Sequence, residues 1–208
     1  AGSLSMAKID TEQRLREIYG YPKGRPVAKE IDYIDPHARR FIELSPFCVI
    51  ATSSASGFGD ASPKGEEPGF VQVLDDHTLA IPDRPGNNRI DGMMNLIENP
   101  SLGLIFLIPG VSETLRINGT AEIRDDADLC KRFEVNGKVP KTVLVVSAKE
   151  VFLHCAKALI RSKLWEDDAK ATERPIPTMS EMIRDQAKMD IPLETEEEMR
   201  ARYKDVLY

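Results

Sequence analysis

Three polar residues, Arg84, Asn88 and Arg89, lie between an apolar run that ends at Ile81 and a helix-like segment that begins at Ile90. The start of a helix presents unpaired N–H groups and the positive end of the helix dipole. Guanidinium groups add charge-assisted hydrogen bonds to a doubly charged anion. These residue types at this place therefore predict a binding site for a phosphate group.

Each of the three residues also has an ordinary structural interpretation. Arg84 pairs with Asp83, Asp91 or another acid. Asn88 caps the following helix, which asparagine does well. Arg89 is a solvated surface residue, as most arginines are. The sequence leaves both interpretations open for each residue.

The segments around this loop are short apolar runs separated by turns, a pattern typical of antiparallel sheets. Few helices separate them, whereas a doubly wound α/β fold needs a helix between successive strands. Residues 53–59 are expected to form a turn, and Ser62 and Lys64 to flank Pro63 in a loop. The predicted fold is mainly β, of the α+β class, a six-stranded antiparallel barrel with peripheral helices. The six strands are expected at residues 47–52, 69–74, 78–81, 102–108, 114–123 and 142–153.

Helical signals flank the predicted barrel. Asp35 is a good N-cap and Pro36 fits a first helical position. The two helices predicted near the C-terminus are charged with narrow apolar stripes, so we expect them to pack on a neighbour. Helices are expected at residues 10–20, 35–44, 90–98, 125–135, 179–189 and 194–207. We divide the chain into a cloning remnant and N-terminus (1–7), an N-terminal helix and loop (8–34), the barrel domain (35–168) and a C-terminal helical extension (169–208).

Composition excludes several classes of protein. The net charge of −6 and the pI near 5.2 argue against a nucleic-acid surface, which needs clustered basic charge. No apolar run approaches the roughly 18 residues of a membrane span, and we find no signal peptide. The three cysteines are an odd number, and we expect them to be reduced. We therefore expect a cytoplasmic protein without a metal site.

The stretch from residue 79 to residue 119 resembles the core of the pyridoxamine 5′-phosphate oxidase-like, FMN-binding split β-barrel proteins. The shared pattern is a strand, a phosphate loop, a short helix that ends in Asn-Pro, an apolar strand and a strand that ends in glycine. Here these positions include Asn87-Asn88-Arg89, Asn99-Pro100 and Gly119. The similarity covers about residues 36–165, and the segments 60–65 and 154–165 resemble a bacterial subgroup of such flavoproteins. The resemblance implies an FMN cofactor and a homodimer with FMN at the subunit interface.

The resemblance also implies roles for the phosphate-loop residues. Arg89 matches the basic residue that binds the FMN phosphate. Asn88 stands where the oxidase often has arginine, and we infer that Arg84 compensates for the missing charge. Asp83 falls near the end of the strand beside the flavin ring. Lys64 lies near the position of an arginine that faces the flavin.

Four further residues are candidates for contacts with the flavin. Thr114 matches a polar residue that reaches the flavin pyrimidine edge from the other subunit; the alternative is an exposed strand threonine. Ser62 lies beside Lys64, where an ordinary turn is the alternative. Arg161 and Trp165 match the C-terminal arginine and tryptophan that the family commonly places over the flavin. The alternative for Trp165 is an anchor in the core or in an interface.

These implications predict a flavin-dependent oxidoreductase that acts on a small molecule, with an electron donor such as NAD(P)H. The chain has no Arg-Leu-His-type segment near its C-terminus, so we do not expect genuine pyridoxamine-phosphate oxidation. No residue is assigned as catalytic. Two alternatives stay open: an F420-type reductase on the same scaffold, and a non-catalytic protein that binds flavin or haem or is related to stress.

Overall fold

The computed structural model describes residues 7–207, so nearly all of the expected cloning remnant lies outside the described residues. Within this range the strands are β1 (Phe47–Ser53), β2 (Gly59–Gly65), β3 (Gln72–Asp75), β4 (Thr78–Pro82), β5 (Ser101–Leu107), β6 (Thr114–Arg124) and β7 (Val143–His154). The helices are α1 (Glu12–Tyr19), α2 (Arg25–Ala28), α3 (Pro36–Leu44), α4 (Asp91–Glu98), α5 (Ala127–Lys131), α6 (Lys157–Ser162), the 3-10 helix η1 (Asp167–Ala169), α7 (Met179–Ala187) and α8 (Glu196–Lys204).

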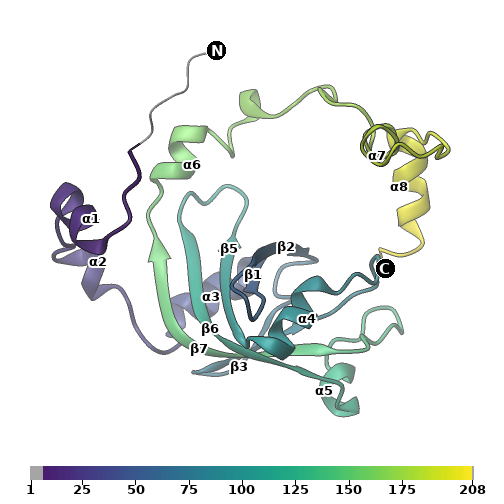
Figure 1. Cartoon of the computed structure of the whole chain (residues 1–208). Coiled ribbons are helices and arrows are strands. Elements are labelled where there is room, and N and C mark those ends of the chain that lie inside the picture. The colour runs from purple at the N-terminus through teal and green to yellow at the C-terminus, as the bar shows by residue number, and fades with distance from the viewer. Residues whose placement is uncertain (1–6, 208) are drawn as a thin grey trace.

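The strands form one antiparallel sheet in the order β2-β1-β5-β6-β7-β4-β3. The long strands β6 and β7 bend along their length, and helices surround the sheet (Figure 1). The molecule therefore has a mixed α+β fold with an open antiparallel sheet. The α+β class was predicted correctly, but the sheet has seven strands in the described residues and not six.

The additional strand is β2, which the sequence analysis treated as a loop. It contains Pro63, and a proline within a strand is tolerated at the edge of a sheet. β2 is such an edge strand, because it pairs only with β1. Asp60, Ser62 and Lys64 are half-buried and alternate with exposed residues. Because the inward positions are polar, the strand lacks the alternation of apolar and polar residues from which strands are predicted.

The core follows from the alternation of side chains along the strands. Cys48, Ile50 and Thr52 of β1 are buried and lie opposite Phe106, Leu104 and Leu102 of β5, respectively. Helix α3 adds three buried residues to the core, and its predicted cap is confirmed, because the Asp35 carboxylate accepts a hydrogen bond from the backbone N–H of Ala38. Burial of each large apolar side chain stabilises the fold by roughly 1.5–3 kcal/mol.

Strand β4 is buried on both faces. Leu79 and Ile81 belong to the main core, whereas Ala80 packs in a second cluster with Cys130 and Phe133. Cys130 lies in α5, which is shorter than the helix expected at residues 125–135. β4 is thus fixed on both sides, and the loop that follows it starts from a rigid position.

The pairing of β6 with β7 contains a bulge, because Asn118 and Gly119 of β6 lie opposite Glu150 and Ala148, and the extra residue Lys149 belongs to β7. A Cβ at Gly119 would clash with the backbone carbonyl oxygen of Ser147. Only glycine permits this close approach of the two strands. The bulge allows β7 to pair with β6 along nearly its whole length and with β4 at one end.

The C-terminal extension forms the two expected helices, α7 and α8, each with a Thr-Glu capping box. Neither helix buries a residue. The chain runs from α6 away from the sheet to these helices and then returns toward it (Figure 1). At the return, the Lys138 amine donates a hydrogen bond to the carbonyl oxygen of Asp205, at 3.3 Å.

Candidate functional site

The predicted phosphate loop connects β4 to α4. Asn88 and Ile90 have left-handed backbone conformations, with φ of 59° and 50°. This conformation is strained for the β-branched Ile90, and such strain concentrates at functional sites. Ile90 occupies the N-cap position, and no side chain among the described residues caps the helix. Asn88 is therefore not the cap, and the first N–H groups of α4 have no side-chain oxygen as a partner.

Arg89 projects from this loop beside the start of α4. Its Nε donates to a carboxylate oxygen of Asp91 at 3.0 Å, and the side chain is 72% exposed. An exposed ion pair of this kind contributes little to stability, so it opposes a competing anion only weakly. Arg89 can therefore turn from Asp91 to a phosphate at the helix start.

Arg84 has a different environment. Its Nε donates to both carboxylate oxygens of Glu66, at 3.0 and 3.1 Å. The side chains of Arg84 and Glu66 are only 14% and 17% exposed. The interpretation that Arg84 pairs with an acid is thus realised, and Glu66 is that acid. Removal of Arg84 would take this partner from the Glu66 carboxylate in a largely buried place.

The structure brings together two other predicted residues, Lys64 of β2 and Asp83 after β4. The amine of Lys64 lies 2.9 Å from a carboxylate oxygen of Asp83, and the two side chains are 28% and 27% exposed. Ser62 lies two residues before Lys64, on the same half-buried face of β2. Ser62 and Lys64 therefore belong to a strand and not to a loop.

Lys64 also lies opposite Cys48 in the register of β1 and β2. Burial raises the pKa of the Cys48 thiol to about 12, and the positive charge of Lys64 opposes this rise only partly. Burial thus disfavours the thiolate form of Cys48, which is the form that acts as a nucleophile.

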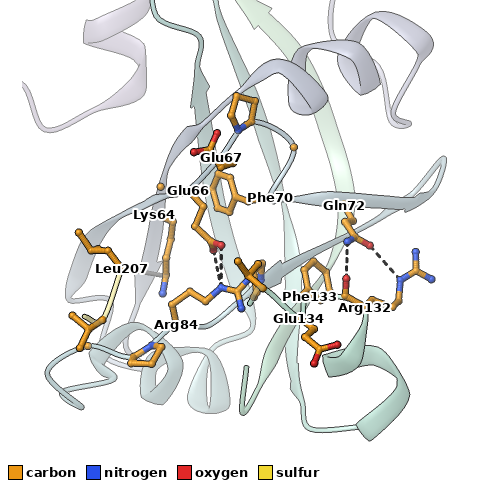
Figure 2. A pocket seen from close by; sticks show the side chains of 18 of the residues that line it. Lys64, Glu66, Glu67, Phe70, Gln72, Arg84, Arg132, Phe133, Glu134 and Leu207 are labelled. Atoms are coloured by element: carbon orange, nitrogen blue, oxygen red, sulfur yellow. Dashed lines mark hydrogen bonds and ion pairs between the residues drawn. The ribbon is translucent and has the colours of Figure 1, made fainter. Parts of the chain in front are cut away.

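A cavity of about 800 Å³ lies beside these ion pairs. Figure 2 shows Glu66 and Arg84 pointing toward one another within it, while the side chain of Arg132 extends away. The apolar part of the lining consists of Pro63, Pro68, Phe70, Pro82, Pro85, Phe133, Val135, Val206 and Leu207. Sequence reasoning missed Glu66, Phe70 and Phe133. Their segments are brought together only by the sheet topology, and no local motif marks them.

Thr114, Arg161 and Trp165 do not line this cavity. Thr114 is 2% exposed, and its hydroxyl finds no hydrogen-bond partner among the described residues. The alternative of an exposed strand threonine is therefore wrong, and in the sheet Thr114 pairs with His154 of β7. Arg161 is exposed on α6. The indole N–H of Trp165 donates to the carbonyl oxygen of Val111 at 2.9 Å, which ties the segment after α6 to the β5–β6 connection.

Two further findings concern metals and membranes. In the described part of the chain, no group of three or more His, Cys, Asp or Glu side chains is arranged to hold a metal ion. No helix within residues 7–207 has the length and apolar character needed to cross a membrane. The three cysteines are free thiols, and Cys155 is exposed.

Residues 34–155, more than half of the chain, match the family model described as pyridoxamine 5′-phosphate oxidase. The chain therefore belongs to this family, and the matched residues include the β4–α4 loop, the ion pair of Lys64 and Asp83, and Thr114. No curated protein matches the chain.

Several solved structures are similar in fold. HupZ of Group A Streptococcus shares 22% identity, with 58% of this chain and 93% of that chain covered and a TM-score of 0.47. A putative pyridoxamine 5′-phosphate oxidase of Lactobacillus delbrueckii shares 20%, with 59% and 99% covered and a TM-score of 0.45. An FMN-binding protein of Syntrophomonas wolfei shares 10%, with 69% and 96% covered and a TM-score of 0.42.

Proposed function

We propose that this protein binds FMN and acts as a flavin-dependent oxidoreductase on a small molecule. The observation that carries the proposal is the β4–α4 loop of a chain that belongs to the pyridoxamine 5′-phosphate oxidase family. There, a helix start without a capping side chain lies beside the exposed guanidinium of Arg89. Both features suit a doubly charged phosphate.

The remaining candidate residues suit the other parts of the cofactor. The amine of Lys64 is a donor for the edge of the flavin ring where negative charge develops on reduction. Asp83 holds this amine in place through the ion pair at 2.9 Å. Thr114 is proposed to contact the flavin edge, and because its hydroxyl is buried and lacks a partner within residues 7–207, this contact requires the side chain to become accessible.

We further propose that the protein works in the cytoplasm as a homodimer with FMN between two copies. The arrangement of the candidate residues supports this proposal, because Thr114, Arg161 and Trp165 lie outside the cavity that contains Lys64 and Arg84. A second copy would bring its own set of these residues to the site. The helices α7 and α8, which bury nothing within one chain, are then available to cover the partner.

When bound, FMN would carry a hydride or electrons between NAD(P)H and the small molecule. The chain's own residues would bind and orient. Arg89 and the first turn of α4 would hold the phosphate, and Lys64 would place a positive charge near the ring. We assign no proton transfer to a particular side chain.

The test begins with mass spectrometry of the small molecule released from freshly purified, denatured protein. We expect FMN, the visible absorbance of oxidised flavin, and loss of that absorbance with NADH or NADPH. A colourless protein that does not bind added FMN would refute the cofactor assignment. A bound flavin that neither nicotinamide reduces would favour a non-catalytic flavoprotein, and a released F420 would favour the F420-type reductase.

The phosphate assignment is tested by Arg89→Ala. We expect this variant to bind FMN at least about tenfold more weakly, because a charge-assisted hydrogen bond to phosphate is lost. The matched control is Arg40→Ala, since Arg40 is 67% exposed and pairs with Glu43 on α3 in a similar way. Equal FMN affinity in the two variants would contradict the role of Arg89.

A further inference from the structure

The three cations of the cavity lining, Lys64, Arg84 and Arg132, have partners within the chain. Arg84 is paired with Glu66 at 3.0 Å, and Lys64 with Asp83 at 2.9 Å. The guanidinium Nε of Arg132, the third cation of the lining, donates to the side-chain oxygen of Gln72 at 3.2 Å. Each of the two ion pairs is neutral in itself, and the lining also contains the acids Glu67 and Glu134. An anion that enters must compete with Glu66 and Asp83 for the same cations.

Part of the cavity wall is apolar. Phe70 and Phe133 are almost fully buried, so their rings are held in place by the protein around them. Four prolines and the C-terminal residues Val206 and Leu207 complete the apolar lining. Leu207 lies across from Phe133 on the other side of the ion pair (Figure 2). An apolar wall with aromatic rings suits a flat, uncharged ring system.

We propose that this cavity is the substrate site, that it takes uncharged aromatic molecules, and that Glu66 excludes phosphorylated ones. The inference rests on the proposed function, because it regards the cavity as the substrate side of the cofactor site. Pro85 and Gly86 connect the two places, since they line the cavity and belong to the β4–α4 loop.

Glu66 is a specificity-determining residue in this proposal and not a catalytic one. Its carboxylate holds Arg84 within a largely buried pair. In such surroundings one unit of charge acts strongly on a dianion that lies within several ångströms. Replacement of Glu66 by glutamine keeps the shape of the side chain and removes one negative charge. The carboxylate that repels a phosphate beside Arg84 is then neutral, so the cavity disfavours a phosphate less.

The experiment uses two probes with the same ring system, 1-naphthol and 1-naphthyl phosphate. Both are titrated by calorimetry into wild-type protein saturated with FMN, so that the phosphate loop is already filled. We expect 1-naphthol to bind at least about tenfold more tightly than 1-naphthyl phosphate. In Glu66→Gln we expect the affinity ratio to shift by at least about tenfold toward 1-naphthyl phosphate.

The matched control is Glu43→Gln, which removes the same charge from an exposed ion pair on α3. We expect it to leave the affinity ratio unchanged. The proposal is overturned if neither probe binds, if wild-type protein binds 1-naphthyl phosphate as tightly as 1-naphthol, or if Glu66→Gln and Glu43→Gln have the same ratio. A melting curve of Glu66→Gln shows whether this variant folds. If it does not fold, the affinities of wild-type protein for 1-naphthol and 1-naphthyl phosphate alone test the proposal.

The experiment separates this inference from the proposed function. Protein that retains FMN but does not discriminate between the probes refutes the substrate class alone. Protein that binds no FMN is titrated without it. If it still prefers 1-naphthol, the cofactor assignment fails and the aromatic site stands.

Discussion

The substitution Thr114→Val tests the most unusual polar group of the fold. The Thr114 hydroxyl is buried and has no hydrogen-bond partner among the described residues. A buried hydroxyl without a partner costs about 1–3 kcal/mol in proteins. Valine has nearly the same shape and replaces the hydroxyl with a methyl group. In flavin-free protein, we therefore expect Thr114→Val to raise the free energy of unfolding by about 1–2 kcal/mol.

Thr52 offers a matched control for the same substitution. It is also buried, at 7% exposure against 2% for Thr114, but its hydroxyl oxygen accepts a hydrogen bond from the Asn95 amide at 3.0 Å. Thr52→Val removes that bond and leaves the amide without its partner. We expect the free energy of unfolding to fall by about 1 kcal/mol. The two threonines should thus respond with opposite signs.

Urea denaturation at equilibrium measures both effects. For a slope of about 2 kcal/mol per molar, the Thr114→Val midpoint should rise by roughly 0.5–1 M, and the Thr52→Val midpoint should fall by about half a molar. FMN affinity should decrease in Thr114→Val, because the flavin would lose a hydrogen bond. If Thr114→Val lowers the midpoint as Thr52→Val does, the hydroxyl has a partner in solution and the reasoning is refuted.

Two further predictions concern the bulge and the thiols. Gly119→Ala should lower the free energy of unfolding by about 1–3 kcal/mol, because the added Cβ meets the backbone of Ser147. The control is Gly86→Ala, which has open space around it and should change the free energy of unfolding little when both variants are measured by thermal unfolding. Cys155 should react with a thiol reagent in the native protein and Cys48 only after unfolding. Because burial raises the Cys48 pKa from 9.0 to about 12, the unfolded chain loses this proton first. The free energy of unfolding should therefore fall as pH rises from 9.0 to about 12, by up to about 1.4 kcal/mol per pH unit. If the free energy of unfolding of Cys48→Ala falls equally steeply over the same pH range, the prediction is contradicted.

The parts of the fold that local sequence determines were predictable. β1, β4, β5, β6 and β7 are apolar runs, and their bounds differ from the expected ones by one or two residues. α3 was recognisable from Asp35 and Pro36 because capping depends on neighbouring residues. β2 was missed because its inward positions are polar and Pro63 interrupts the pattern.

The candidate site was only partly predictable, because its contacts depend on register. Lys64 and Asp83 were both named, but their ion pair follows from a strand that sequence reasoning did not find. The pairing of Arg84 with Glu66 likewise joins the end of β2 to the loop after β4. Thr114 was expected in a strand, but its burial arises only in the folded chain and is not marked by the local sequence.

An open sheet presents two rows of backbone groups that could recruit a strand from another molecule and begin aggregation. In this protein both borders are poor templates. β2 lacks one amide hydrogen at Pro63 and presents a charged lysine beside it, while β3 at the opposite border spans only Gln72–Asp75 and is irregular where it pairs with β4. The proline that concealed β2 in the sequence thus protects the folded chain against uncontrolled polymerisation.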